Sequence, residues 1–112
     1  MSLIPHLHIG GAIVESAAPY RNMRNGVSGR KAGCQVDLLI QTARTAYVVE
    51  IKRQTAIGPE IEDEVKRKID CLPLRPGMTP RPVLVYDGSL SPSVEGTGFF
   101  DAIIPAQKLL GI

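Results

Sequence analysis

The clearest pattern of hydrophobic and polar positions lies in the middle of the chain, where apolar side chains alternate with polar ones in two short runs. Because successive side chains of a strand point to opposite faces, each run predicts a strand with one apolar face. The short spacing between the runs predicts a hairpin that turns at Ala43 and Arg44. The apolar faces consist of Val36, Leu38 and Ile40 on the first strand and Tyr47, Val49 and Ile51 on the second. The other faces carry Asp37 on the first strand, and Glu50 and Lys52 on the second.

A two-residue turn sets the register of the two strands. Asp37 then lies directly opposite Glu50 across the pair, and Lys52 shares the face of Glu50 because it is two residues further along. A slip of one residue would send the two carboxylates to opposite faces of the sheet. The pattern therefore predicts three charged groups on one face of an otherwise apolar hairpin.

A helix is predicted to begin at Pro59, shortly after the hairpin. Proline suits the first position of a helix, and acidic side chains favour the positive end of the helix dipole. The acidic residues are Glu60, Glu62, Asp63 and Glu64, and the apolar residues at helical spacing are Ile61, Val65, Ile69 and Leu72. Because the acidic side chains are spread around the helix, we expect them not to converge on a metal ion.

The segments before the hairpin are shorter and interrupted. A strand is expected at Ala12–Ala17, continuing through Tyr20–Met23 after a break at Pro19. Asn25–Gly33 contains three glycines and predicts a polar loop. The loop does not match the phosphate-binding loop of nucleotide-binding proteins, so we expect no bound nucleotide.

Beyond the helix, residues 74–82 are rich in proline and predict a connector without regular structure. A strand is expected at Pro82–Tyr86, where Asp87-Gly88 ends it, and a last short or edge strand at Phe99–Ile104. A brief helix is expected at Pro105–Leu110. The predicted order is β-β-β-α-β-β-α.

Length and composition narrow the class of protein. The chain of 112 residues fits a single domain, residues 1–112. No apolar run is long enough to cross a membrane, and the first residues do not resemble a signal peptide. We therefore expect a cytoplasmic protein without a membrane partner, in which Cys34 and Cys71 are reduced and buried. A disulfide between the two cysteines is the less favoured alternative.

The net charge of +2 is too small to indicate a nucleic-acid partner by itself. Residues 1–58 hold seven basic and three acidic side chains, whereas the remainder holds six basic and eight acidic ones. The basic excess flanks the charged face of the hairpin, where Arg30 and Lys31 are candidates for contact with a phosphate backbone. An ordinary solvated surface explains the same distribution equally well.

The three charged residues of the hairpin suit the chemistry of a divalent cation. Two half-buried carboxylates on one face repel each other unless a cation lies between them. Mg²⁺, or Mn²⁺ in its place, needs only one or two carboxylates besides water and phosphate oxygens. Asp37 and Glu50 would supply these, the carbonyl of Ile51 would add a ligand, and Lys52 would orient a water molecule or stabilise charge on a phosphate. The alternative is a salt-bridge cluster at the rim of the sheet, because such spacings also arise by chance.

The spacing D-x(12)-E-x-K, formed by Asp37, Glu50 and Lys52, resembles the motif of the PD-(D/E)xK nuclease superfamily. More narrowly, the pattern PYRN…GCQVDLLIQT…VVEIKR…EVKRKID…RPVLVYDG…FFDAII…LL is similar to the C-terminal nuclease-like domain of prokaryotic AAA-type ATPases. The resemblance implies an α/β (α+β) fold of the restriction-endonuclease-like type. Such a fold has a mixed central sheet of four to five strands with flanking helices.

The same resemblance implies Mg²⁺-dependent cleavage of DNA. Asp37 and Glu50 would hold the metal and Lys52 would be the catalytic lysine. Near this motif, the residues expected to line the site or contact DNA are Gln35, Arg53 and Gln54. The main alternative is a non-catalytic nuclease-like module that binds DNA or serves assembly.

Two departures from the family pattern affect the expected site and partners. The superfamily core begins with a helix that often contributes an acidic residue, and the sequence before Ala12 is too short and glycine-broken to supply one. Glu15 is the only acidic residue upstream, and we expect it on a strand, which leaves its role in the site open. A missing helix would leave apolar sheet surface uncovered, so a homodimer or another subunit that covers this surface is expected. Because the ATPase module is absent, a separate ATPase is a further expected partner.

Overall fold

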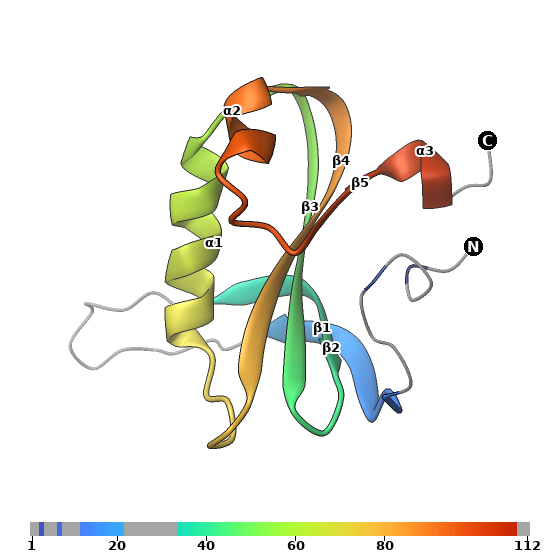
Figure 1. The fold of residues 1–112 in the computed structure, drawn as a ribbon, viewed down its shortest axis with the longest axis vertical. Coiled ribbons are helices and arrows are strands. Elements are labelled where there is room, and N and C mark those ends of the chain that lie inside the picture. Colours follow the sequence, from blue (N-terminus) through green and yellow to red (C-terminus); the bar gives the residue numbers. More distant parts are fainter. Residues whose placement is uncertain (1–2, 4–6, 8–11, 22–33, 110–112) are drawn as a thin grey trace.

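A computed structural model describes Leu3, Leu7, residues 12–21 and residues 34–109. These residues form a mixed sheet of five strands in the order β1-β2-β3-β4-β5, with a helix between β3 and β4 (Figure 1). The strands are β1 (Ser16–Arg21), β2 (Gln35–Gln41), β3 (Thr45–Ile57), β4 (Thr79–Leu90) and β5 (Ala102–Pro105), and the helices are α1 (Glu60–Cys71), α2 (Pro92–Gly96) and α3 (Ala106–Leu109). The β1–β2 and β2–β3 pairs are antiparallel, and β3–β4 and β4–β5 are parallel. The α+β class, the mixed sheet and the predicted order of strands are therefore confirmed, with α2 as an added short helix.

The turn between β2 and β3 has the predicted length of two residues. The backbone N–H of Thr42 donates to the Thr45 carbonyl at 2.9 Å, and the Thr45 N–H donates to the Thr42 hydroxyl at 3.1 Å. This side-chain bond supports a turn that has neither glycine nor asparagine at its centre. The ladder runs from Gln41 opposite Ala46 to Leu38 opposite Val49, so the predicted register is confirmed.

An irregularity in β2 changes which side chains share a face. Against β1, Ala18 pairs with Leu39 and Tyr20 pairs with Val36, so three steps along β2 match two along β1. The extra residue is a β-bulge, which bends a strand and redirects its side chains. Val36 therefore packs with Leu39 on the α1 side, whereas Leu38 packs on the opposite side. The prediction that Val36 and Leu38 share a face was wrong for this reason.

β4 is much longer than its predicted five residues. It begins at Thr79 inside the supposed connector, passes through Pro80 and Pro82, and continues past Gly88. Proline is tolerated in a strand where no hydrogen-bond donor is needed. The Pro82 carbonyl accepts the Asp101 N–H at 2.8 Å, which places the polar groups of Pro82 on the β5 side. No donor is therefore missing from the β3–β4 ladder at Pro82.

Gly88 lets β4 continue where the sequence suggested an end. Its φ of 126° lies in the region that favours glycine. A Cβ atom at this position would collide with the Gln54 carbonyl of β3. The two strands thus approach closely beside the register shift between Gln54 and Ala56.

The two ends of the chain differ from prediction in their boundaries. β1 begins at Ser16 and continues through Pro19, so the prediction of a strand at Ala12–Ala17 was displaced by a few residues. β5 begins at Ala102 rather than Phe99, and it includes Pro105, which was expected to open the last helix.

Apolar side chains are buried on both faces of the sheet. On one face, Val65 of α1 and Val94 of α2 pack over Leu84. On the other face, Tyr47 belongs to a cluster of buried apolar residues that includes Leu7. Leu109 of α3 packs against the same cluster. The expectation of an uncovered apolar face was therefore wrong, which removes the reason given for a homodimer.

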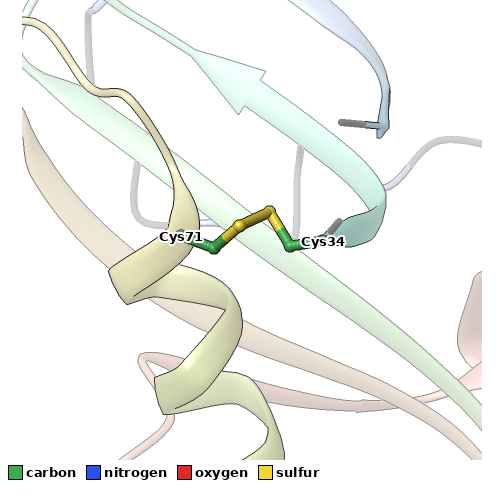
Figure 2. Close-up of a disulfide and its surroundings, with 2 residues drawn as sticks. All are labelled: Cys34 and Cys71. Atoms are coloured by element: carbon green, nitrogen blue, oxygen red, sulfur yellow. A yellow bond between two sulfur atoms is a disulfide. The ribbon is translucent and has the colours of Figure 1, made fainter. Parts of the chain in front are cut away.

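Cys34 and Cys71 form a disulfide (Figure 2), which corrects the prediction of reduced thiols. Cys34 directly precedes β2, and Cys71 is the last residue of α1. Their Cα atoms are 6.2 Å apart, within the range that a disulfide spans. The proximity arises from the packing of α1 on the sheet, which the 37-residue sequence separation did not reveal.

Within the described part of the chain, no helix is long and apolar enough to cross a membrane.

Candidate functional site

The predicted charged residues come together where β3 passes under α1. Glu50 and Lys52 are on β3, and Asp37 is in the irregular part of β2, next to the last ladder pair. Glu50 is 3% exposed, which makes it the only buried charged residue among those described. A buried carboxylate is stable only with hydrogen bonds or a charged partner.

Four side chains form a closed ring of ion pairs, namely Glu50, Lys52, Glu64 and Lys68. Lys68 Nζ donates to Glu50 Oε1 at 2.7 Å, and Lys52 Nζ lies 3.6 Å from Glu50 Oε2. The same two lysines also contact Glu64 Oε2, Lys52 at 2.8 Å and Lys68 at 3.8 Å. Each glutamate therefore has two cationic neighbours, and the ring of four charges is neutral.

Asp37 binds the backbone of the facing strand. Its Oδ2 accepts the Ile51 N–H at 2.8 Å, at the point where the β2–β3 ladder has ended. The side chain thus takes the place of a backbone acceptor. This bond fixes the Asp37 carboxylate on the residue that follows Glu50, and it satisfies a backbone N–H of β3 beyond the end of the ladder with β2.

The environment shifts the pKa values of three groups in the ring. Burial raises the pKa of Glu50, and the hydrogen bond from Lys68 opposes that rise. Glu64 also raises the pKa of Glu50, and the charge of Asp37 adds the smallest raising effect. Burial also acts to raise the pKa of Glu64, but the hydrogen bonds to Lys52 and Glu50 outweigh it and lower the pKa. The hydrogen bond to Glu64 raises the pKa of Lys52. The two carboxyl groups are therefore pushed in opposite directions, which is common at functional sites and in structural ion-pair networks alike.

Glu64 and Lys68 were not among the predicted site residues. They are four positions apart on α1, so they lie on one face of the helix. The sequence did carry this i, i+4 signal, but not which helix face would meet the hairpin. Of the four acidic residues at the start of α1, Glu64 turns its carboxylate towards Lys52 of β3.

Other predicted residues lie outside this ring. Gln35, Arg53 and Gln54 are exposed, and Gln54 is two residues beyond Lys52 on the same strand. Arg30 and Lys31 fall outside the described residues.

Glu15 does not belong to the charged cluster. Its backbone N–H donates to the Gln41 carbonyl, near the turn end of the hairpin. Its carboxylate contacts Arg75 at 3.4 Å instead of a residue of the ring. Glu15 therefore makes no contribution to the site in this arrangement.

The carboxylates have the chemistry that Mg²⁺ or Mn²⁺ requires, because both ions bind oxygen ligands and need few from protein. Asp37 uses one oxygen for the Ile51 N–H, which leaves the second available. Glu50 has both oxygens near lysine Nζ atoms, and the closer contact is with Lys68. No group of three or more His, Cys, Asp or Glu side chains suited to a metal is found in the described part of the chain. Any cation held by Asp37 and Glu50 would therefore have to compete with Lys68 for Glu50.

No protein-family model, curated protein or solved structure matches this chain.

Proposed function

We propose that the protein is a metal-dependent nuclease of the restriction-endonuclease-like type, acting on DNA through Asp37, Glu50 and Lys52. The supporting observations are that Glu50 is the buried acid among the described residues, that Lys52 Nζ lies 3.6 Å from it, and that Asp37 binds the N–H of the next residue, Ile51. A buried carboxylate beside a second carboxylate is costly for folding alone. That cost is understandable if the two groups bind a cation.

Each residue has a role that follows from its position. Asp37 and Glu50 would hold Mg²⁺ or Mn²⁺, with the Ile51 carbonyl as a further ligand. The cation would lower the pKa of bound water and polarise the phosphodiester. Lys52, whose Nζ lies 3.6 Å from Glu50, would orient the attacking water or stabilise the charge that develops on the phosphate.

Side chains next to the cluster would hold the DNA backbone. Arg53 and Gln54 follow Lys52 and are exposed, as is Gln35 at the start of β2. Arg30 and Lys31 remain proposed contacts on the basis of sequence. Contacts to phosphates position a duplex without reading its bases, so this set gives no reason to expect sequence specificity.

A non-catalytic nuclease-like module for DNA binding or assembly is the second candidate. The observation that favours it is the neutral ring, in which both Glu50 oxygens already face lysines. A separate ATPase remains a proposed partner for either function. A homodimer is also proposed, but it is not needed to cover an apolar face of the sheet.

We propose a cytoplasmic location. Disulfides of cytoplasmic proteins, where present, are usually catalytic or redox-sensing. The Cys34–Cys71 bond is compatible with that location if it opens and closes.

Cleavage of supercoiled, linear and branched DNA in Mg²⁺ or Mn²⁺ tests the proposal. The comparison is between the parent, Asp37→Asn and Lys52→Ala, with Asp70→Asn as the matched control because Asp70 is exposed on α1 outside the ring. Cleavage by the parent and the Asp70 variant that both site variants abolish supports the nuclease. DNA binding by all four proteins without metal-dependent cleavage supports the second candidate.

A further inference from the structure

The disulfide encloses every residue of the charged cluster. Cys34 lies three residues before Asp37, and Cys71 lies three residues after Lys68. The bond therefore joins the strand that carries Asp37 to the end of the helix that carries Lys68 (Figure 2).

Both buried residues of α1 lie in its first two turns. Ile61 and Val65 are buried in the core beneath the helix, whereas Ile69 is only partly buried and Lys68 is about one-fifth exposed. Leu72, the residue after the helix, is buried and would keep this end of the helix near the sheet without the disulfide. Opening the bond would loosen the last turn of α1 without detaching the helix.

Lys68 occupies the carboxylate oxygen that a cation would need. Its Nζ lies 2.7 Å from Glu50 Oε1, the shortest ion pair in the ring. A charged hydrogen bond of this length in a buried setting competes strongly with other ligands of the same oxygen. Holding the last turn of α1 in place therefore holds the cation site closed.

We propose that the Cys34–Cys71 disulfide is a redox-reversible clasp that keeps Lys68 on Glu50, and that reduction by a dithiol opens the Asp37–Glu50 pair to a divalent cation. This inference rests on the proposed metal site. It assigns the oxidised protein as the inhibited form and the reduced protein as the form competent to bind metal.

The exchange needs a dithiol as the electron donor. One thiolate of the dithiol attacks the sulfur of Cys71, which is the more exposed of the two cysteines. The disulfide breaks, Cys34 leaves as a thiolate and takes a proton from solvent. The second thiol of the dithiol then attacks the mixed disulfide and releases Cys71. Two electrons pass to the protein, and the dithiol ends as a disulfide.

Titration with Mn²⁺, followed by calorimetry, tests the clasp. Four proteins are compared without oxygen and after removal of the reductant: oxidised parent, reduced parent, oxidised Lys68→Gln and reduced Lys68→Gln. Loss of one charged hydrogen bond predicts that reduction tightens Mn²⁺ binding of the parent about tenfold. Lys68→Gln should bind as tightly as the reduced parent in both states.

Two further variants test whether the change in Mn²⁺ binding depends on the Lys68–Glu50 ion pair and on the disulfide. Lys66→Gln removes the same charge from α1 but leaves the four ion pairs intact. The Nζ atom of Lys66 lies over the aromatic side chain of Phe99, 5.3 Å from its centroid. It should keep the redox dependence of the parent. Cys34→Ser with Cys71→Ser should match the reduced parent without any reductant.

Hydrogen exchange reports on the clasp without metal. Amides in the last turn of α1 should exchange faster in the reduced parent, while those near Val65 remain protected. Equal exchange in both states, or loss of the whole helix on reduction, would overturn the clasp.

The failures of the two proposals can be told apart. Mn²⁺ binding that ignores the redox state, or redox dependence that persists in Lys68→Gln, overturns the clasp and leaves the metal site standing. Absence of Mn²⁺ binding in all four proteins overturns the metal site and the inference with it.

Discussion

The two faces of β3 begin alike and end differently. Under α1, Ala46 and Val48 are buried apolar residues, and the next residue on that face is the charged Glu50. On the opposite face Tyr47 and Val49 are equally buried, but the next residue is the apolar and half-exposed Ile51.

This comparison identifies Glu50 and Ile51 as the two residues of β3 that packing alone would not select. An apolar residue at the position of Glu50 would satisfy the core without an ion-pair network, and a polar residue at the position of Ile51 would suit an exposed surface. In some proteins a buried charge is retained for conformational specificity rather than for stability. The α1 side of β3 is therefore the side on which to search for activity.

The largest effect on the free energy of unfolding is expected from loss of the disulfide that ties α1 to the sheet. Replacing both Cys34 and Cys71 by serine should lower the free energy of unfolding by ~4 kcal/mol, because a loop of 37 residues is no longer closed in the unfolded chain. Urea denaturation of the oxidised parent and the double variant measures the difference. No loss of stability would mean that the disulfide does not form in the folded protein.

The opposite face should respond as an ordinary core. Val49 is fully buried among aliphatic side chains. Val49→Ala should cost about 2–3 kcal/mol through lost contacts and a residual cavity, with no change in Mn²⁺ binding. A variant that loses metal binding while keeping its stability would contradict the separation of the two faces.

The two glutamates of the ring should respond oppositely to pH. The pKa of Glu50 is raised in the folded state, so its contribution is greatest below its ordinary value of 4.5 and is lost as pH rises above it. The pKa of Glu64 is lowered, so its contribution is present above 4.5 and is lost as pH falls.

Unfolding of Glu50→Gln and Glu64→Gln across pH 3–8 checks these signs. Relative to the parent, the free energy of unfolding of the Glu50 variant should improve as pH rises, and that of the Glu64 variant should worsen. The same trend in both variants would mean that the ring titrates as one group.

The smallest effect is expected at Ile51. Its side chain is 47% exposed, so Ile51→Thr should change the free energy of unfolding by less than about 0.5 kcal/mol. Its backbone N–H, which Asp37 binds, is retained in the variant. Thermal unfolding measures the change, and a loss of more than about 1 kcal/mol would mean that the exposed side chain packs against something in solution.

The parts of the fold that depend on neighbouring residues could be predicted from the sequence. Strand alternation and a two-residue turn set the register that runs from Gln41 opposite Ala46 to Leu38 opposite Val49, and proline with acidic residues marked the start of α1. Both signals act over a few residues.

Features that depend on tertiary packing could not be predicted in the same way. Pro80 lies in the stretch that was predicted to lack regular structure, yet β4 runs through it. At Pro82 the carbonyl faces the β5 side, so its missing N–H leaves no gap in the β3–β4 ladder. Lys68 reaches Glu50 only because α1 crosses the sheet with that face inward, and the same crossing brings Cys71 to Cys34. Neither juxtaposition has a signature in local spacing.

The central claim is that Asp37 and Glu50 form a divalent-cation site, and calorimetric titration with Mn²⁺ tests it most directly. The reduced parent is compared with an Asp37→Ala, Glu50→Ala double variant and with Asp70→Asn. We predict saturable binding by the parent and the Asp70 variant, and none by the double variant. Undiminished binding by the double variant would contradict the claim.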